Sequence, residues 1–357
     1  KGRSDPLVGI IPDGLELTVK IDINPDDSTI DVDLRDNPPS VDCGLNTSEA
    51  SATSAVMGAI FNTLDGDIPR NAGSFRRINF KFAEDSVVGA PKFPHSCSVS
   101  TTNVAERLVN ITQSAFSQIG EGFGLAQGGT GLGAGMAVVS GLDHRHKNSP
   151  YVNRMMLSTN GGPASPNADG WVNYAIPVIA GLMYRDSVEL DELKHPFRIE
   201  ELCLIEDSAG AGRYRGAPAQ EVTYRPLKND MTVVIPCDGQ IVAPEGVCGG
   251  ENGTPGSTYL IESSGEKIKL PNLINILVTG QQAIRGRDSS GGGYGDPLCR
   301  LSERVLHDVL EGYESRAKAK DVYGVVFIGK IEDETLEVDI IATEQLRETI
   351  RKKRKRA

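Results

Sequence analysis

The sequence predicts an α+β protein with a mixed helix-and-sheet N-terminal part and a largely antiparallel, β-rich C-terminal part. Apolar and polar residues alternate between residues 15 and 34, which is the period of a half-buried strand. Apolar residues recur every three to four positions over residues 104–119, the period of an amphipathic helix. Short apolar runs separated by Gly, Pro and Asn fill residues 199–279. This change of pattern predicts two regions, 1–198 and 199–357.

The N-terminal region is predicted to begin with a β-hairpin. Its two strands span residues 15–23 and 30–34, and the polar residues 24–28 have the composition of a turn. A helix is expected over residues 48–64, where apolar side chains stand four residues apart. A short strand with one apolar face is expected at residues 78–82.

The helix at residues 104–119 is the clearest in the chain, and Asn103 with Glu106 three residues later matches a capping box. A glycine-rich segment follows at residues 122–135. Such segments can bind phosphate through backbone N–H groups. No Gly-Lys-Ser/Thr follows, however, so the segment is not a P-loop. A structural loop is the favoured interpretation, and phosphate binding is the alternative.

The C-terminal region is predicted to contain short strands and then helices. The strands are expected at residues 201–205, 221–224, 232–235, 258–261 and 274–278. Two helices at residues 303–310 and 316–322, two strands at 322–328 and 336–340, and a helix from residue 344 complete the region. The basic residues 351–356 end this last helix, where positive charge suits the helix dipole, and we expect a solvated helix end there.

The composition excludes several classes of protein. A net charge of -11 repels phosphate and 5% aromatic residues leave little for base stacking, so no nucleic-acid partner is expected. The six cysteines form no CxxC pair, which fits neither a zinc ribbon nor a disulfide scaffold. No apolar run reaches the length of a membrane span, and no signal core follows Lys1. We therefore expect a cytoplasmic protein with no membrane partner.

Three groups of titratable residues are weak candidates for a site. His144 and His146 stand in a segment with the composition of an exposed loop, and His95 with Cys97 is poorly spaced for a catalytic pair. Glu189 and Glu192 belong to an acidic cluster around residue 195 and would serve acid–base chemistry if they were buried together. A solvated acidic surface is the alternative for this cluster.

Two segments combine glycines with charged residues and are the strongest candidates. Arg213 and Arg215 stand two apart between glycines, so on an extended chain both guanidinium groups would face one side and bind a carboxylate or bicarbonate. The alternative is that they hold a subunit interface through ion pairs. The substrate or interface candidates are Asp207, Ser208, Arg213, Arg215, Glu189 and Glu192. The loop candidates are Gly291, Gly292, Gly293 and Asp296.

These two segments resemble the C-terminal signatures of the hydantoinase B/oxoprolinase family. The family pattern leads from an Asp-Ser-Gly run into Gly-Arg-Tyr/Phe-Arg-Gly, and later has a triple-glycine Tyr-Gly-Asp-Pro, a helix and Tyr-Gly-Val. These patterns are present here in this order at residues 207–216, 289–297 and 323–325. Residues 68–73 and 160–170 are also similar, so the resemblance covers nearly the whole chain.

The resemblance implies that the chain is the C-terminal part of a B-type subunit. The family's full B-type subunit is longer at its N-terminus, and that part carries the His and Asp motifs expected to hold a divalent metal, Zn or Mn. Nothing here matches them, so we expect the metal on that missing part or on a companion chain, and none on this one. ATP and Mg are expected on an ATPase-like hydantoinase A subunit. Since the chain opens on Lys1, we expect a natural subunit, a processed product or a fragment.

The activity that the resemblance implies is an ATP-dependent amidohydrolase that opens a cyclic amide such as a hydantoin, oxoproline or lactam. An ATP-dependent, biotin-independent ketone carboxylase and a non-catalytic scaffold half of such a complex remain as alternatives. In each case the particle is expected to be hetero-oligomeric. If a separate chain supplies the N-terminal half, we expect it to cover the apolar face of the hairpin at residues 15–34.

Overall fold

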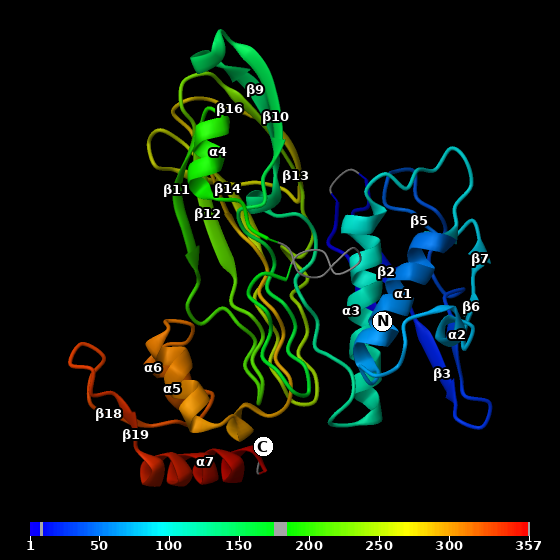
Figure 1. Cartoon of the computed structure of the whole chain (residues 1–357), viewed down its shortest axis with the longest axis vertical. Helices are drawn as coiled ribbons and strands as arrows, with labels where there is room; N and C mark the ends of the chain where they lie inside the picture. The colour runs from blue at the N-terminus through cyan, green and yellow to red at the C-terminus, as the bar shows by residue number, and fades with distance from the viewer. Residues whose placement is uncertain (8–9, 175–183, 356–357) are drawn as a thin grey trace.

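The computed structural model describes residues 1–7, 10–174 and 184–355 and arranges them around three large apolar cores and a small one at Leu132 and Met136 (Figure 1). The first core lies in an N-terminal unit, the second between two β-sheets, and the third among the C-terminal helices. Helices and antiparallel sheets occur side by side, so the predicted α+β class is confirmed. Of the helices that the structure describes, none is long and apolar enough to cross a membrane.

The N-terminal unit packs two helices, α1 (Glu49–Thr63) and α3 (Val104–Phe116), against small sheets. Strands β3 (Lys20–Asn24) and β4 (Thr29–Asp33) form the predicted hairpin, and β6 (Ile78–Lys81) pairs parallel to β4. The shorter elements are β1 (Gly2–Arg3), β2 (Glu16–Leu17), β5 (Thr47–Ser48), α2 (Ala72–Phe75), β7 (Ala83–Glu84) and β8 (Val88–Ala90).

The apolar face of the hairpin is covered within the chain itself. Leu17, Val32 and Leu34 are fully buried in the same core as Val56 of α1 and Leu108 of α3. The expectation that a companion chain covers this face is therefore wrong for its inner part, which packs with α1 and α3, whereas Ile23 near the hairpin turn is 45% exposed.

The middle of the chain forms a β-sandwich. One sheet has the order β10-β9-β13-β16, the other β11-β12-β17-β14-β15, and all pairs in both are antiparallel. The strands of the first sheet are β9 (Val138–Asp143), β10 (Ser149–Arg154), β13 (Met231–Pro236) and β16 (Leu273–Val278). Those of the second are β11 (Phe197–Leu204), β12 (Gln220–Pro226), β14 (Ser257–Ile261), β15 (Lys267–Lys269) and β17 (Ala283–Arg287). A short helix, α4 (Val188–Lys194), precedes β11. Since β9 and β10 come before residue 198, the sandwich draws strands from both sequence regions.

Glycine-rich extended segments lie side by side at the end of the sandwich near the C-terminal helices (Figure 1). Backbone hydrogen bonds join them: Gly292 N–H donates to Gln127 O, and Gly291 N–H donates to Ala217 O, at 2.8 and 2.9 Å. A Cβ on Gly291 would stand 1.8 Å from Gly162 O, so no side chain fits between the segments. The glycines at residues 122–135, predicted as a structural loop, are one layer of this bundle.

The C-terminal unit contains α5 (Ser302–Leu310), α6 (Arg316–Asp321) and α7 (Ile340–Arg354), with a two-stranded sheet of β18 (Phe327–Ile328) and β19 (Glu337–Val338). Helix α7 begins four residues before its predicted start because the Asp339 side chain accepts the Ala342 N–H and caps it. Its basic end is not simply solvated: the Arg351 guanidinium donates to Leu298 O, and that of Arg354 pairs with Asp296.

Candidate functional site

The two arginines of the first signature do not form a joint anion clamp. Arg215 is buried, its Nε donates to Asp308 Oδ1 at 2.9 Å, and its guanidinium lies over the Tyr313 ring. Arg213 is half-exposed and pairs with Glu121 at 3.0 Å. Each guanidinium already has its own carboxylate within the chain, so the expectation of one shared anion is not met.

Arg215 belongs to a buried ion-pair network that the sequence did not reveal. Arg300, which is 1% exposed, donates through Nε to Asp308 Oδ2 at 3.0 Å and through Nη1 to Asp169 Oδ1 at 2.7 Å. Asp169 also accepts the Arg215 N–H at 2.9 Å. The network joins the glycine-rich segments to α5, so its evident role is to fix the C-terminal unit in place.

The remaining predicted residues also have partners within the chain. Asp207 accepts the Ser315 N–H at 2.7 Å, and the Ser208 hydroxyl donates to Ile205 O. Asp296 accepts the Leu298 N–H. Gly293, like Gly291 and Gly292, is packed among the glycine-rich segments.

The predicted acidic cluster is not brought together as an acid–base pair. Glu189 is exposed and accepts from the Ser187 hydroxyl. Glu192 Oε1 accepts the Ile199 N–H at 2.7 Å and so links α4 to β11. The His144 segment is a short turn in which Arg145 binds both carboxylate oxygens of Asp143.

A polar site lies instead on the face of α3 that meets the glycine-rich segments. Glu106 Oε2 accepts the Gly131 N–H at 2.7 Å, and Asn110 exchanges two hydrogen bonds of 2.9 Å with the backbone of Gly128. Both side chains are almost fully buried. The predicted capping box is wrong, because Asn103 makes no side-chain cap and Glu106 turns toward Gly131. Polar residues at positions 106, 110 and 113, one helical face, were the overlooked signal.

The environment of Glu106 favours the protonated form of its carboxyl. Burial raises the pKa of this carboxyl to about 8, and the Asp238 carboxylate acts in the same direction. The hydrogen bond from Gly131 and the charges of Arg107 and Arg154 oppose the increase. Glu106 Oε1 has no hydrogen-bond partner among the described residues, so one buried polar atom of this carboxyl is left unsatisfied by the chain.

An ion-pair chain beside Glu106 connects the N-terminal unit to the sandwich. Arg107 Nε donates to Asp238 Oδ2 at 2.7 Å, and Asp238 Oδ1 accepts the Asp5 N–H. The Asp5 carboxylate accepts the consecutive backbone N–H groups of residues 240–242 and an N–H of Asn272. Burial and Asp238 raise the pKa of Asp5, whereas Arg107 lowers that of Asp238 against its burial.

A second buried carboxyl lies across the glycine segment. Burial raises the pKa of Asp288 to about 6, while the hydrogen bond from the Ser158 hydroxyl and the charge of Arg185 lower it. Asn160 links the two halves of the site, since it donates to Gly131 O at 2.8 Å and accepts the Ser289 N–H at 3.1 Å. The arrangement thus holds two carboxyls that can give or take a proton near neutral pH.

The described residues do not provide a convincing metal site. One group has the spacing of metal ligands: Glu201, Cys203 and Glu221 on β11 and β12. Glu221 is already bound by Arg285 and lies 3.4 Å from Arg287, so cations of the protein neutralise it. This group does not fit the divalent metal that the family resemblance implies.

Comparison with known proteins places the chain in a family. Residues 5–297 match the family described as hydantoinase B/oxoprolinase. The beta subunit of the caprolactamase of Pseudomonas jessenii is 29% identical over 88% of this chain and 54% of its own length. The B subunit of a putative D-/L-hydantoinase of Pseudomonas sp. (strain NS671) is 25% identical over 93% of this chain and 55% of its own. The delta subunit of the acetophenone carboxylase of Aromatoleum aromaticum is 25% identical over 88% of this chain and 50% of its own length.

The fold agrees with these similarities. The crystal structure of the ATP-dependent caprolactamase from Pseudomonas jessenii superposes with a TM-score of 0.79 at 24% identity, over 97% of this chain and 59% of that one. The chain spans about half the length of these three relatives. The signatures, the match over most of the chain and the fold agree: the chain belongs to the hydantoinase B/oxoprolinase family.

Proposed function

We propose that the chain is part of a B-type subunit of an ATP-dependent amidohydrolase that opens a cyclic amide such as a lactam, a hydantoin or oxoproline. The observation that carries the proposal is the 29% identity to the caprolactamase beta subunit over 88% of the chain. The B subunit of the putative hydantoinase, matched over 93% of the chain, supports the same class of substrate.

A cyclic amide is a poor electrophile, and opening it requires activation of the carbonyl and a proton for the departing nitrogen. ATP with Mg, held by a hydantoinase A-type partner, would activate the amide oxygen, and a Zn or Mn ion outside this chain would polarise an oxygen or activate water. Glu106 is this chain's candidate for the proton. Burial raises the pKa of its carboxyl to about 8, Oε1 has no hydrogen-bond partner among the residues that the structure describes, and Oε2 accepts the Gly131 N–H.

The second candidate function is that of a ketone carboxylase subunit. The 25% identity to the acetophenone carboxylase delta subunit over 88% of the chain favours it. In this reaction bicarbonate would be consumed and a C–C bond formed, so the two candidates differ in their dependence on bicarbonate.

The test is an assay of the assembled particle, purified together with its ATPase-like partner. ADP release is measured with caprolactam, hydantoin and 5-oxoproline, and separately with acetone or acetophenone plus bicarbonate. The proposal predicts that an amide stimulates ADP release without bicarbonate and that mass spectrometry detects the ring-opened product. If ketones but no amide stimulate ADP release, and only when bicarbonate is present, the protein is a carboxylase subunit instead.

A further inference from the structure

The outward face of the sheet β10-β9-β13-β16 is open and mainly apolar, although Ser140, Thr232 and Asn275 also lie on it. An antiparallel sheet with one solvated face normally places polar side chains on it. Here Val152 is 70% exposed, Leu277 is 57% exposed and Leu142 is 50% exposed. The register aligns Val152 with Leu277 across the two central strands, and Arg154 is the one charged residue that these four strands turn outward.

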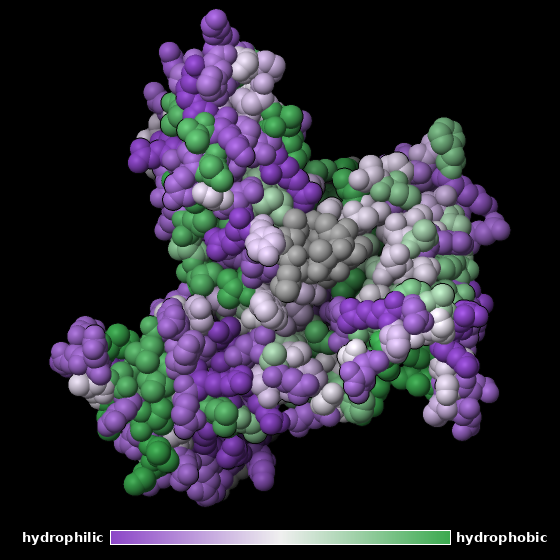
Figure 2. Space-filling view, in the orientation of Figure 1, coloured by the Kyte–Doolittle hydropathy of each residue, from purple (hydrophilic) through white to green (hydrophobic). Residues whose placement is uncertain are grey.

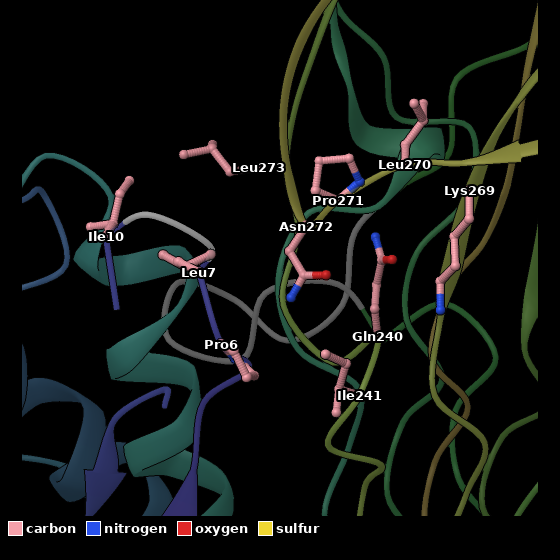
Figure 3. Close-up of a pocket in the computed structure, with 10 residues that line it drawn as sticks. All are labelled: Pro6, Leu7, Ile10, Gln240, Ile241, Lys269, Leu270, Pro271, Asn272 and Leu273. Atoms are coloured by element: carbon pink, nitrogen blue, oxygen red, sulfur yellow. The ribbon is translucent and has the colours of Figure 1, made fainter. Parts of the chain in front are cut away.

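This apolar surface continues into a groove between the sandwich and the N-terminal unit. Leu273, at the end of β16, faces Leu7 and Ile10 across a groove of about 740 Å³ (Figure 3). Ile10 and Ile241 on its walls are 49% and 60% exposed. Apolar side chains are scattered over the edges of both units that are visible in Figure 2. We call the surface formed by Leu142, Val152, Leu277, Leu273, Ile10 and Ile241 the cleft face.

We propose that the cleft face binds the polypeptide that corresponds to the unmatched half of the B-type relatives, whether it is a companion chain or part of the same one. Those relatives carry about as much chain again as this one matches, so a segment of comparable length is available to cover this face. A surface with little charge and exposed branched aliphatic side chains is typical of a permanent interface. The proposal rests on family membership and is independent of the substrate.

A second copy of this chain fits the cleft face less well. Two sheets can stack only if both faces are accessible to a flat partner. The N-terminal unit stands beside this sheet and forms the other wall of the groove, so an opposing sheet would meet that unit (Figure 1). A segment that enters the groove of about 740 Å³ does not need a flat opposing face.

The test replaces Val152 and, separately, Leu277 by Lys and measures binding of the polypeptide equivalent to the unmatched half of the caprolactamase beta subunit. Each substitution should weaken binding by about a hundredfold or more, because a lysine would be buried without a partner. Ile341→Lys on α7 is the matched control, since Ile341 is also 70% exposed but lies at the opposite end of the molecule (Figure 1). All three variants should keep the melting temperature of the isolated chain because the replaced side chains are already exposed.

If both halves form one polypeptide, the readout is amide hydrogen exchange in the intact protein. Strands β10 and β16 should be protected in the wild type and lose protection in Val152→Lys and Leu277→Lys. Wild-type binding or protection in both variants would overturn the proposal. So would a self-associating chain that Val152→Lys converts to a monomer, because the occupant would then be a second copy. Neither result depends on which amide or ketone the complex consumes.

Discussion

Replacing Asp308 by Asn should lower the free energy of unfolding by about 3–5 kcal/mol, the usual loss when one partner of a buried ion pair is removed. Asp308 is 1% exposed and accepts hydrogen bonds from both Arg215 and Arg300. Their side chains are 7% and 1% exposed, so neither guanidinium can turn to water when the charge of Asp308 is lost. Asn keeps the size of the side chain, so no cavity contributes.

The matched control is Glu121→Gln, which removes the carboxylate partner of Arg213. The two side chains of this pair, Arg213 and Glu121, are 49% and 65% exposed, so its loss should cost at most about 1 kcal/mol. Urea unfolding can be followed by the fluorescence of Trp171, the single Trp of the chain, which stands two residues from Asp169 of the same network. Equal unfolding midpoints for Asp308→Asn and Glu121→Gln would refute the reasoning, since burial of the first network is the sole basis for the difference.

Four further outcomes are expected. The pKa of Glu106 in the folded state lies above its ordinary value of 4.5, so the folded state binds more protons than the unfolded state between pH 4.5 and about 8. The free energy of unfolding should therefore fall as the pH rises through this window, by up to about 1.4 kcal/mol per pH unit. Urea unfolding of Glu106→Gln should show a weaker pH dependence than the wild type. If Glu106 supplies the proton, the same substitution should lower kcat of the assembled enzyme about a hundredfold or more. Light scattering should show that the complex still assembles. Gly291→Ala should cost about 4 kcal/mol or more, because its Cβ would meet Gly162 O, whereas Gly66→Ala, with open space around it, should leave the melting temperature unchanged. Calorimetry on the chain alone should detect no submicromolar ATP binding, because the chain lacks a P-loop and carries a net charge of -11.

Local periodicity was sufficient to predict the individual elements. The hairpin at residues 15–34 and the helix at 104–119 could be read from the sequence because a strand repeats every two residues and a helix every 3.6. The family signatures were equally local, since each is a short run of glycines and charged residues. Within these limits the class of fold and the family needed no coordinates.

The partners of the charged residues depended on the tertiary structure. Arg213 and Arg215 look alike in the sequence, yet one is half-exposed beside Glu121 and the other is buried against Asp308, 93 residues away. Glu106 satisfied a local capping pattern but hydrogen-bonds to Gly131, because α3 packs on the glycine-rich segments. The periodicity of the sequence indicates which side of a helix or strand is buried. Only the packing of distant segments decides which group lies beside a buried charged residue, and therefore whether the pKa of that residue is raised or lowered.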